Sequence, residues 1–274
     1  MKFKYLIIVF SVLIALVIII TVLLPMTLAG PEFAVDFRLM TLPLLIFMVL
    51  LLVGMGIFFF FNYRLLSLLE REDWPALAYY LEQKIFVKGK YSNRNVRLLA
   101  SSYLVISDHV SVLKLENKAM IAKPAVVGRN LLIFGTARIL SGNHAEAAAF
   151  FHSHLENEKF YKKDENWARW YYGFSLLLSG AFKLAQPEFA SLAVSSDNAV
   201  ITGLSAYFLN NSITKHSENP ADCLAAAESG RIRVINAVKN RAGWKKEADK
   251  MRSDIHVAII KKYIDEAAQW LFSK

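Results

Sequence analysis

Two long apolar runs near the start of the chain, Tyr5–Leu24 and Leu39–Phe61, contain no charged residue. A helix of about 20 apolar residues is long enough to cross about 30 Å of bilayer hydrocarbon. Each run meets this length, and only Gly30–Arg38 separates them. The sequence therefore predicts a hairpin of two transmembrane helices, and we assign residues 1–63 to a membrane anchor.

The first run has a competing interpretation as a signal peptide that is cleaved. Lys2 and Lys4 precede the run, as basic residues do in secretory signals. The small residues Ala29 and Gly30 follow it, as at a cleavage site. However, the run is longer than the usual apolar core of about 7–15 residues. We expect a retained helix and keep cleavage as the alternative.

Most basic residues near the two predicted spans lie before the first span or after the second. The short connection between the spans carries Arg38 together with two acidic residues, Glu32 and Asp36. Positive flanks stay on the cytoplasmic side of a membrane, so we expect an inner-membrane (plasma-membrane) protein with both termini in the cytoplasm. The basic flanking residues are Lys2, Lys4, Arg64, Arg71, Lys84, Lys88 and Lys90.

The rest of the chain, residues 64–274, is long enough for one substantial domain with its own core. Its lone cysteine, Cys223, excludes an internal disulfide and a metal site built from several cysteines. We found no segment of sustained alternating hydrophobicity, so we expect an all-α domain with no resident cofactor.

The formal net charge of +9 is concentrated in two segments. Lys88–Arg129 holds eight Lys or Arg against two Asp or Glu, a net charge of +6, and Arg231–Arg252 has the same balance. Such patches attract anionic lipid head groups by about 1 kcal/mol per well-placed basic side chain. A solvated surface explains them equally well. Nucleic acid is the less favoured partner, because aromatic residues that stack on bases are sparse in both segments.

The most specific internal signal is a repeat at a spacing of 38 residues. Each copy has an apolar helical run, a turn centred on glycine, and a second run with alanine and then phenylalanine four positions later. This order predicts two antiparallel helical hairpins. The recurring pairs are Gly135 and Gly173, Leu140 and Leu178, Ser141 and Ser179, Gly142 and Gly180, Ala147 and Ala185, and Phe151 and Phe189.

Each repeated position has a physical role. Gly135 and its counterpart lie inside a helix, where glycine costs about 1 kcal/mol relative to alanine, so we expect close contact with the partner helix there. Gly142 and its counterpart follow Leu-Ser at a helix end, where a left-handed conformation is needed. Ala147 then supplies a small contact surface, and Phe151 fills the gap beside it. The second copy repeats these roles at Gly173, Gly180, Ala185 and Phe189.

This pattern resembles the tetratricopeptide repeat, a helix–turn–helix unit of 34 residues. Asn130–Leu155 and Asn166–Val194 match it at the inner glycine, the turn glycine, the alanine and the aromatic residue. They depart from it at the early tryptophan position, which is Leu131 in one copy and Arg169 in the other, and both lack the closing proline. The resemblance implies an α-solenoid of stacked hairpins that binds other proteins.

The order of a two-span N-terminal hairpin and cytoplasmic helical repeats is also similar to the layout of HemY-type inner-membrane proteins. Weaker helical patterns flank the central pair, and we expect the last of them to cap the solenoid. Proline inside a helix bends it, so Pro187 should kink the second helix of the second hairpin. The flanking helices that we expect are Asp73–Phe86, Asn95–Ser107, Ala199–Asn210, Pro220–Gly230, Arg231–Lys239 and Glu247–Phe272.

A dense aromatic cluster gives the sharpest candidate for partner binding. Trp167, Trp170 and Phe174 project from the first helix of the second hairpin toward the expected concave face. Large aromatic side chains anchor partner peptides at small entropic cost, so these three residues are our candidate partner groove. The alternative is that they pack between neighbouring hairpins.

Local motifs for catalysis and phosphate loops are absent from the sequence, and the histidines at 144, 152 and 154 do not share one helix face. We therefore expect no catalytic residue and no metal ligand. The leading hypothesis is a non-enzymatic membrane scaffold whose repeat domain binds proteins. The alternatives are a basic module for anionic lipid or nucleic acid, and a membrane enzyme whose site is assembled from dispersed residues.

Overall fold

The computed structural model describes residues 3–28, 30–156, 164–251 and 254–273. All regular secondary structure within these ranges is helical, which confirms the expected all-α class. The chain divides into two compact units, residues 1–80 and 81–274, and each unit is described by itself. The division lies beyond the predicted boundary at residue 63, because the helix that holds this boundary continues to Glu70.

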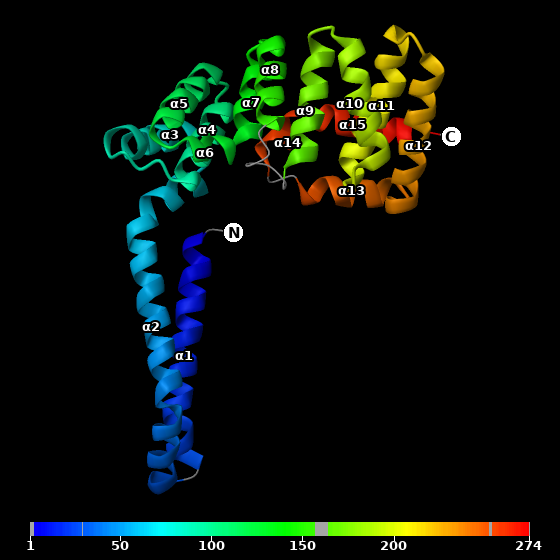
Figure 1. The fold of residues 1–274 in the computed structure, drawn as a ribbon. Coiled ribbons are helices and arrows are strands. Elements are labelled where there is room, and N and C mark those ends of the chain that lie inside the picture. The colour runs from blue at the N-terminus through cyan, green and yellow to red at the C-terminus, as the bar shows by residue number, and fades with distance from the viewer. Residues whose placement is uncertain (1–2, 29, 157–163, 252–253, 274) are drawn as a thin grey trace. The chain divides into compact units, whose positions relative to one another are not determined.

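The first unit consists mainly of two long helices that pack against each other, α1 (Phe3–Leu28) and α2 (Gly30–Glu70) (Figure 1). The prediction of a nine-residue connection over Gly30–Arg38 is wrong, since this segment already belongs to α2. Its only helix-breaking residue, Pro31, lies in the first turn, where a missing backbone N–H is tolerated. A short helix, α3 (Trp74–Glu82), follows, and Asp73 Oδ1 caps it by accepting from the Ala76 N–H at 3.1 Å.

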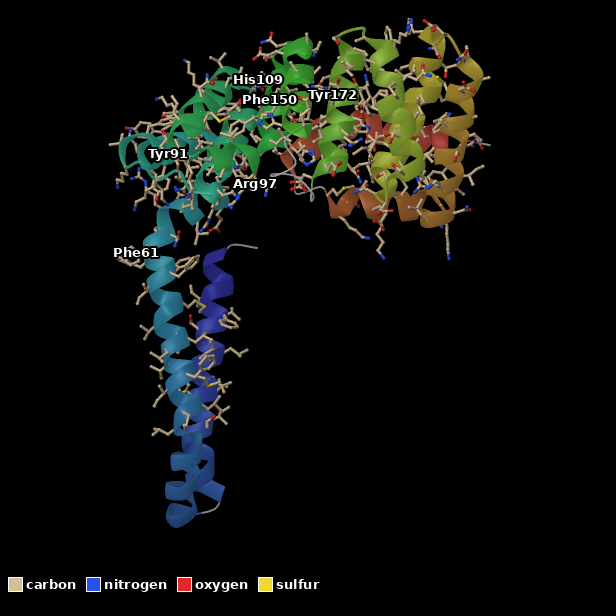
Figure 2. The ribbon with its side chains drawn as sticks, in the orientation of Figure 1. Phe61, Tyr91, Arg97, His109, Phe150 and Tyr172 are labelled. Carbon is tan, nitrogen blue, oxygen red and sulfur yellow. The ribbon has the colours of Figure 1, made fainter. Side chains whose placement is uncertain are left out.

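Large apolar side chains cover the outside of α2. Phe60 is 80% exposed and Phe61 is 76% exposed, and Figure 2 shows Phe61 pointing away from the helix. Soluble proteins rarely leave so much contiguous apolar surface in water. Among the described residues, Leu42–Glu70 is long and apolar enough to cross a membrane, and Ile8–Thr21 is a shorter apolar helical stretch.

The second unit is a succession of helices that mostly pack on their neighbours in sequence. Figure 1 shows α7 to α12 standing side by side, with α13 to α15 running across them. The elements are a π-helical turn (Gln83–Val87), α4 (Asn93–Val105), α5 (His109–Ala122), α6 (Pro124–Gly128), α7 (Leu131–Leu140), α8 (His144–Leu155), α9 (Glu165–Leu178), α10 (Phe182–Ser195), α11 (Ala199–Asn211), a 3₁₀ turn (Ile213–His216), α12 (Pro220–Val238), α13 (Arg241–Lys250), α14 (Ile255–Ile259) and α15 (Lys261–Leu271).

The two repeat copies form the hairpins α7–α8 and α9–α10, and their turns have the same geometry. Gly142 and Gly180 have φ angles of +81° and +79°, the left-handed region that only glycine adopts readily. The next residue then donates its N–H back to the preceding helix in both copies. Asn143 N–H bonds to Arg138 O at 3.1 Å, and the equivalent bond from Ala181 is 2.9 Å long. These are the bonds of a helix end that glycine terminates.

Ala147, Phe151, Ala185 and Phe189 are completely buried where the helices of each hairpin meet. Gly135 lies directly under the Phe151 ring, and a Cβ atom there would be 2.0 Å from Phe151 Cζ. At Gly173 the nearest atom to such a Cβ is Glu188 Cβ at 3.3 Å. The first copy is therefore packed more tightly than the second.

Several predicted helix boundaries are wrong. Gly230 does not end a helix: it lies within α12, where an added Cβ would be 2.9 Å from Ala206 Cβ. The expected single helix over Glu247–Phe272 is divided among α13, α14 and α15. Helix α5 was not predicted, although Asp108 Oδ1 caps it by accepting from the Ser111 N–H at 3.0 Å. Pro187 lies within α10, which continues to Ser195.

The last three helices fold back over earlier ones instead of capping the end of the row. Helix α13 packs against α11 and α12, α14 packs against α7, and α15 packs against α11. The apolar side of α15 supplies buried side chains to this contact, including Ile264, Ala267 and Leu271. One face of the central helices is therefore covered by the chain's own C-terminal segment.

The unequal packing of the two repeat copies can be tested with matched substitutions. Gly135→Ala should lower the free energy of unfolding by about 1–3 kcal/mol, because the new methyl group displaces a buried ring in a packed core. Gly173→Ala should be nearly neutral or stabilising by up to about 1 kcal/mol, since its closest contact is far looser and alanine favours helix. Urea unfolding of the full chain in neutral detergent, followed by tryptophan fluorescence, measures both. Equal destabilisation by the two substitutions would contradict the packing difference.

Candidate functional site

The residues predicted to line a partner groove belong instead to an aromatic core. Trp167 is 8% exposed, Trp170 is fully buried and Phe174 is 4% exposed. The Trp170 ring stacks on Phe174 with a centroid separation of 5.0 Å and makes an edge contact with Phe189 at 6.3 Å. The prediction of a groove at Trp167, Trp170 and Phe174 is therefore wrong, and the alternative of packing between helices describes them.

The C-terminal helices explain why this face is not open. His256 on α14 contacts Trp167 edge to face at 5.2 Å, and Tyr263 on α15 contacts Phe174 in the same manner at 5.3 Å. Both covering residues come from the segment that folds back over the row. The large aromatic side chains do anchor another segment, as their residue types predict. That segment is this chain's own C-terminal part.

His256 and Tyr171 form a buried polar contact inside the aromatic core. The Tyr171 hydroxyl donates to the His256 backbone carbonyl at 2.8 Å and lies 3.3 Å from His256 Nδ1. Burial lowers the pKa of His256 to about 4; nearby Asp254 raises it and Arg97 lowers it, both by smaller amounts. Burial also raises the pKa of Tyr171. Both groups are therefore neutral near pH 7, and they lock α14 onto α9.

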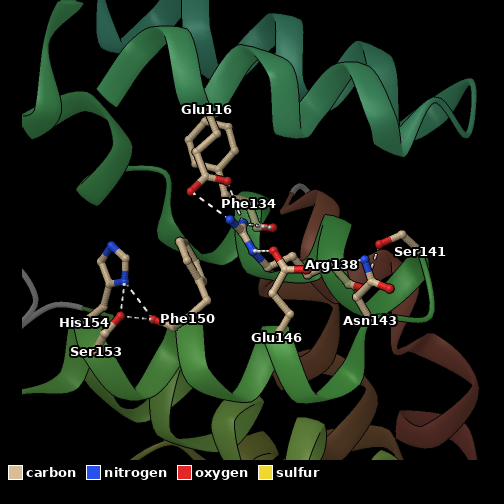
Figure 3. A network of polar contacts seen from close by, with 9 residues as sticks. All are labelled: Glu116, Phe134, Arg138, Ser141, Asn143, Glu146, Phe150, Ser153 and His154. Carbon is tan, nitrogen blue, oxygen red and sulfur yellow. Dashed lines mark hydrogen bonds and ion pairs between the residues drawn. The ribbon is translucent and has the colours of Figure 1, made fainter. Parts of the chain in front are cut away.

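A buried ion pair joins α5, α7 and α8 (Figure 3). The Arg138 guanidinium donates to Glu116 through two nitrogens, at 2.6 and 3.1 Å, and its Nε lies 3.4 Å from Glu146 Oε1. The same group lies 4.1 Å above the Phe150 ring. The Glu116 side chain is only 5% exposed. All charges in this cluster are paired, so the cluster serves to hold the three helices together.

The two histidines near the end of α8, His152 and His154, are engaged in local contacts. His152 Nδ1 lies 3.8 Å from Glu156, and His154 Nδ1 lies 2.7 Å from the Phe150 carbonyl. Among the described residues, no group of three or more His, Cys, Asp or Glu side chains is arranged to hold a metal ion.

A groove with a volume of about 900 Å³ lies between α13, α14 and α15. Its floor is apolar and is built from Trp244, Val257, Ile264 and Ala268, each at most 6% exposed. Exposed charged residues surround the floor: Arg241, Lys245, Asp249, Lys261 and Asp265.

Three cations at the edge of this groove are not engaged in ion pairs within the described part of the chain. Within the described ranges, no ion pair includes Arg241, Lys245 or Lys261, whereas the adjacent Lys250 and Lys262 are paired with glutamates on their own helices. Sequence reasoning identified the basic character of this segment. It missed the groove, because it treated the three helices that form it as one.

The neutral His256 predicts a specific loss of stability in acid. Its pKa is lower in the folded chain than the usual 6.5, so its contribution is complete above about pH 6.5 and is lost as the pH falls toward 4. In this window the free energy of unfolding should fall more steeply for the natural chain than for His256→Gln, by up to about 1.4 kcal/mol per pH unit. Urea unfolding at pH 7, 6 and 5 measures the difference. Equal slopes would contradict it.

Comparisons with known proteins agree with one another. An uncharacterized protein of Treponema pallidum (strain Nichols) is 26% identical over 218 residues, which cover 77% of this chain and 69% of that protein. No solved structure matches the chain. The model of a family described as "Uncharacterised Treponema protein" matches residues 111–273, from α5 to α15. Since this match covers more than half of the sequence, the chain belongs to that family.

Proposed function

We propose that this chain is a membrane-anchored adaptor whose helical domain binds another protein at the cytoplasmic face of the inner membrane. In this proposal α1 and α2 both span the bilayer, and the helices α7 to α12 form a TPR-like solenoid. The exposed apolar surface of α2 and the charge-free run Tyr5–Leu24 support the anchor. The shared geometry of the hairpins α7–α8 and α9–α10 supports the repeat.

The groove between α13, α14 and α15 is the observation that carries the binding proposal. An apolar floor with charges at its edge suits an amphipathic helix, which places its apolar face in the groove. The lining includes three cations, Arg241, Lys245 and Lys261, which outnumber the carboxylates of Asp249 and Asp265. The partner is therefore a protein helix with acidic residues beside its apolar face.

Site-specific cross-linking in intact membranes tests this proposal. A photoreactive residue at Ala258, which is exposed in the groove, should capture a discrete protein. The double substitution Lys245→Glu with Lys261→Glu should reduce capture by about 2- to 30-fold, because it removes two exposed ion pairs of about 0.2–1 kcal/mol each.

Two controls make this experiment specific. A photoreactive residue at Ala225, an exposed position on α12, should not capture the same protein. Lys246→Glu with Lys262→Glu changes the charge equally at neighbouring positions that do not line the groove, and it should leave capture unchanged. Equal loss with both double substitutions, or capture from both positions, would refute the groove as the binding site.

The proposed topology has its own test. A reporter enzyme that is active only outside the cytoplasm, fused after Lys274, should be inactive, because the basic flank after α2 holds that end in the cytoplasm. A fusion after Asp36, in the part of α2 that precedes the apolar run Leu39–Phe61, should be active. Activity at the C-terminal fusion would overturn the orientation.

A further inference from the structure

A second concave site lies in the other basic segment, at the start of the second unit. It is a pocket of about 710 Å³ between the π-helical turn, the loop after it, the beginning of α4 and the end of α5. Four of its lining residues are cations, Lys84, Lys90, Arg94 and Lys123, and none is Asp or Glu. We call it the four-cation pocket.

Local backbone structure holds these cations together. Lys90 donates its N–H to the Lys84 carbonyl at 3.2 Å, which closes the loop that contains Gly89, at φ +64°. Asn95 is 5% exposed, and its amide donates to the Lys90 carbonyl at 2.9 Å. Its backbone N–H in turn bonds to the capping Ser92 Oγ at 3.2 Å. The loop is thereby tied to the first turn of α4, which carries Arg94.

Three of the four cations that line the pocket, Lys90, Arg94 and Lys123, have no ion-pair partner in the part of the chain that the structure describes. Burial lowers the pKa of Lys84, and repulsion from Arg94, Lys90 and Lys88 lowers it further. These cations are therefore close enough to destabilise one another, and an anion placed among them would relieve the repulsion.

The carboxylate that lies nearest to the pocket in sequence already has another partner. Glu82 precedes the pocket by two residues, but it accepts a hydrogen bond from the Tyr103 hydroxyl at 2.6 Å. Since this carboxylate is engaged and no Asp or Glu lines the pocket, an anion from outside the chain fits among the cations.

Phosphate matches the donors that line the pocket. The Arg94 guanidinium provides a planar pair of N–H donors that suits two phosphate oxygens, and the lysines add point charges. The unsatisfied N–H groups at the start of the 13-residue helix α4 point in the direction that favours an anion. Tyr91, labelled in Figure 2, and Ser92 contribute further polar groups to the lining.

We propose that the four-cation pocket binds a phosphate group, with Arg94 as the bidentate ligand and Lys84, Lys90 and Lys123 neutralising its charge. This inference goes beyond the proposed adaptor role and does not depend on it. The phosphate belongs either to a lipid head group or to a small soluble compound, and the two sources share this chemistry.

Two probes distinguish the sources, both applied to the full chain in a neutral detergent. The soluble probe is inorganic phosphate, titrated by calorimetry at constant ionic strength with chloride as the reference anion. The lipid probe is phosphatidic acid mixed into the micelles, with phosphatidylcholine as the reference, and the readout is the thermal unfolding midpoint. Saturable binding of either probe, beyond its reference, is the expected result.

Matched variants make the test specific to the pocket. Arg94→Gln with Lys123→Gln should weaken binding of the effective probe about tenfold or more, because it removes a bidentate ligand and a second cation. Arg129→Gln with Lys114→Gln removes the same charge from exposed positions of the same basic segment outside the pocket. This control should alter binding by less than about twofold, as a screened distant charge does.

The outcomes separate clearly. Pocket-dependent binding of inorganic phosphate supports the proposal with a soluble ligand, and pocket-dependent stabilisation by phosphatidic acid alone supports it with a lipid. Equal loss in the pocket and control variants would show a diffuse charge effect and overturn the proposal. Absence of saturable binding with both probes would also overturn it. None of these results affects cross-linking from Ala258.

Discussion

Close approach between consecutive helices is the constraint on which the second unit depends. It is achieved by a small residue on one helix facing a phenylalanine on the next, as Gly135 faces Phe151. The same ring also reaches the following hairpin: Phe151 on α8 stacks on Tyr171 of α9 at 5.7 Å, and Phe189 on α10 stacks on Phe208 of α11 at 5.6 Å. One aromatic position per copy therefore sets the spacing within a hairpin and joins it to the next.

Some parts of the fold depend on local sequence and others on contacts between distant helices, and only the first kind could be predicted. The turn glycines, Gly142 and Gly180, are fixed by a local backbone requirement, so their spacing alone was enough to place both hairpins. Gly230 was misread as a helix end because its neighbours, Ala206 and Ala193, come from other helices. A glycine in a helical pattern indicates either a terminus or a close contact, and only the folded chain separates the two. For α5 the signal was present in its Asp108 cap, and the prediction simply overlooked it.

The candidate site was less predictable, because it depends on contacts between segments that are far apart in the sequence. The aromatic residues of α9 were recognised as anchors, yet the sequence gives no indication of what lies against them. Their covering residues, His256 and Tyr263, are more than 80 positions away along the chain. The C-terminal segment was expected to cap the end of the row, and nothing in the sequence indicated that it would cover the central helices. The packing of the C-terminal helices on the aromatic side of α9 therefore closes the expected groove there.

The two basic segments show why composition by itself does not specify a ligand. Both have a net charge of +6, but the fold places them in different surroundings. In the first, the cations gather over a polar loop and a helix beginning, and the neighbouring carboxylate of Glu82 accepts from Tyr103. In the second, they surround a floor built from Trp244, Val257 and Ile264. The former suits a compact anion that replaces water around the cations, whereas the latter suits an amphipathic surface that covers apolar area. The surface beside each set of charges, polar in one case and apolar in the other, determines which ligand it can bind. That surface is built by helices that are distant in sequence.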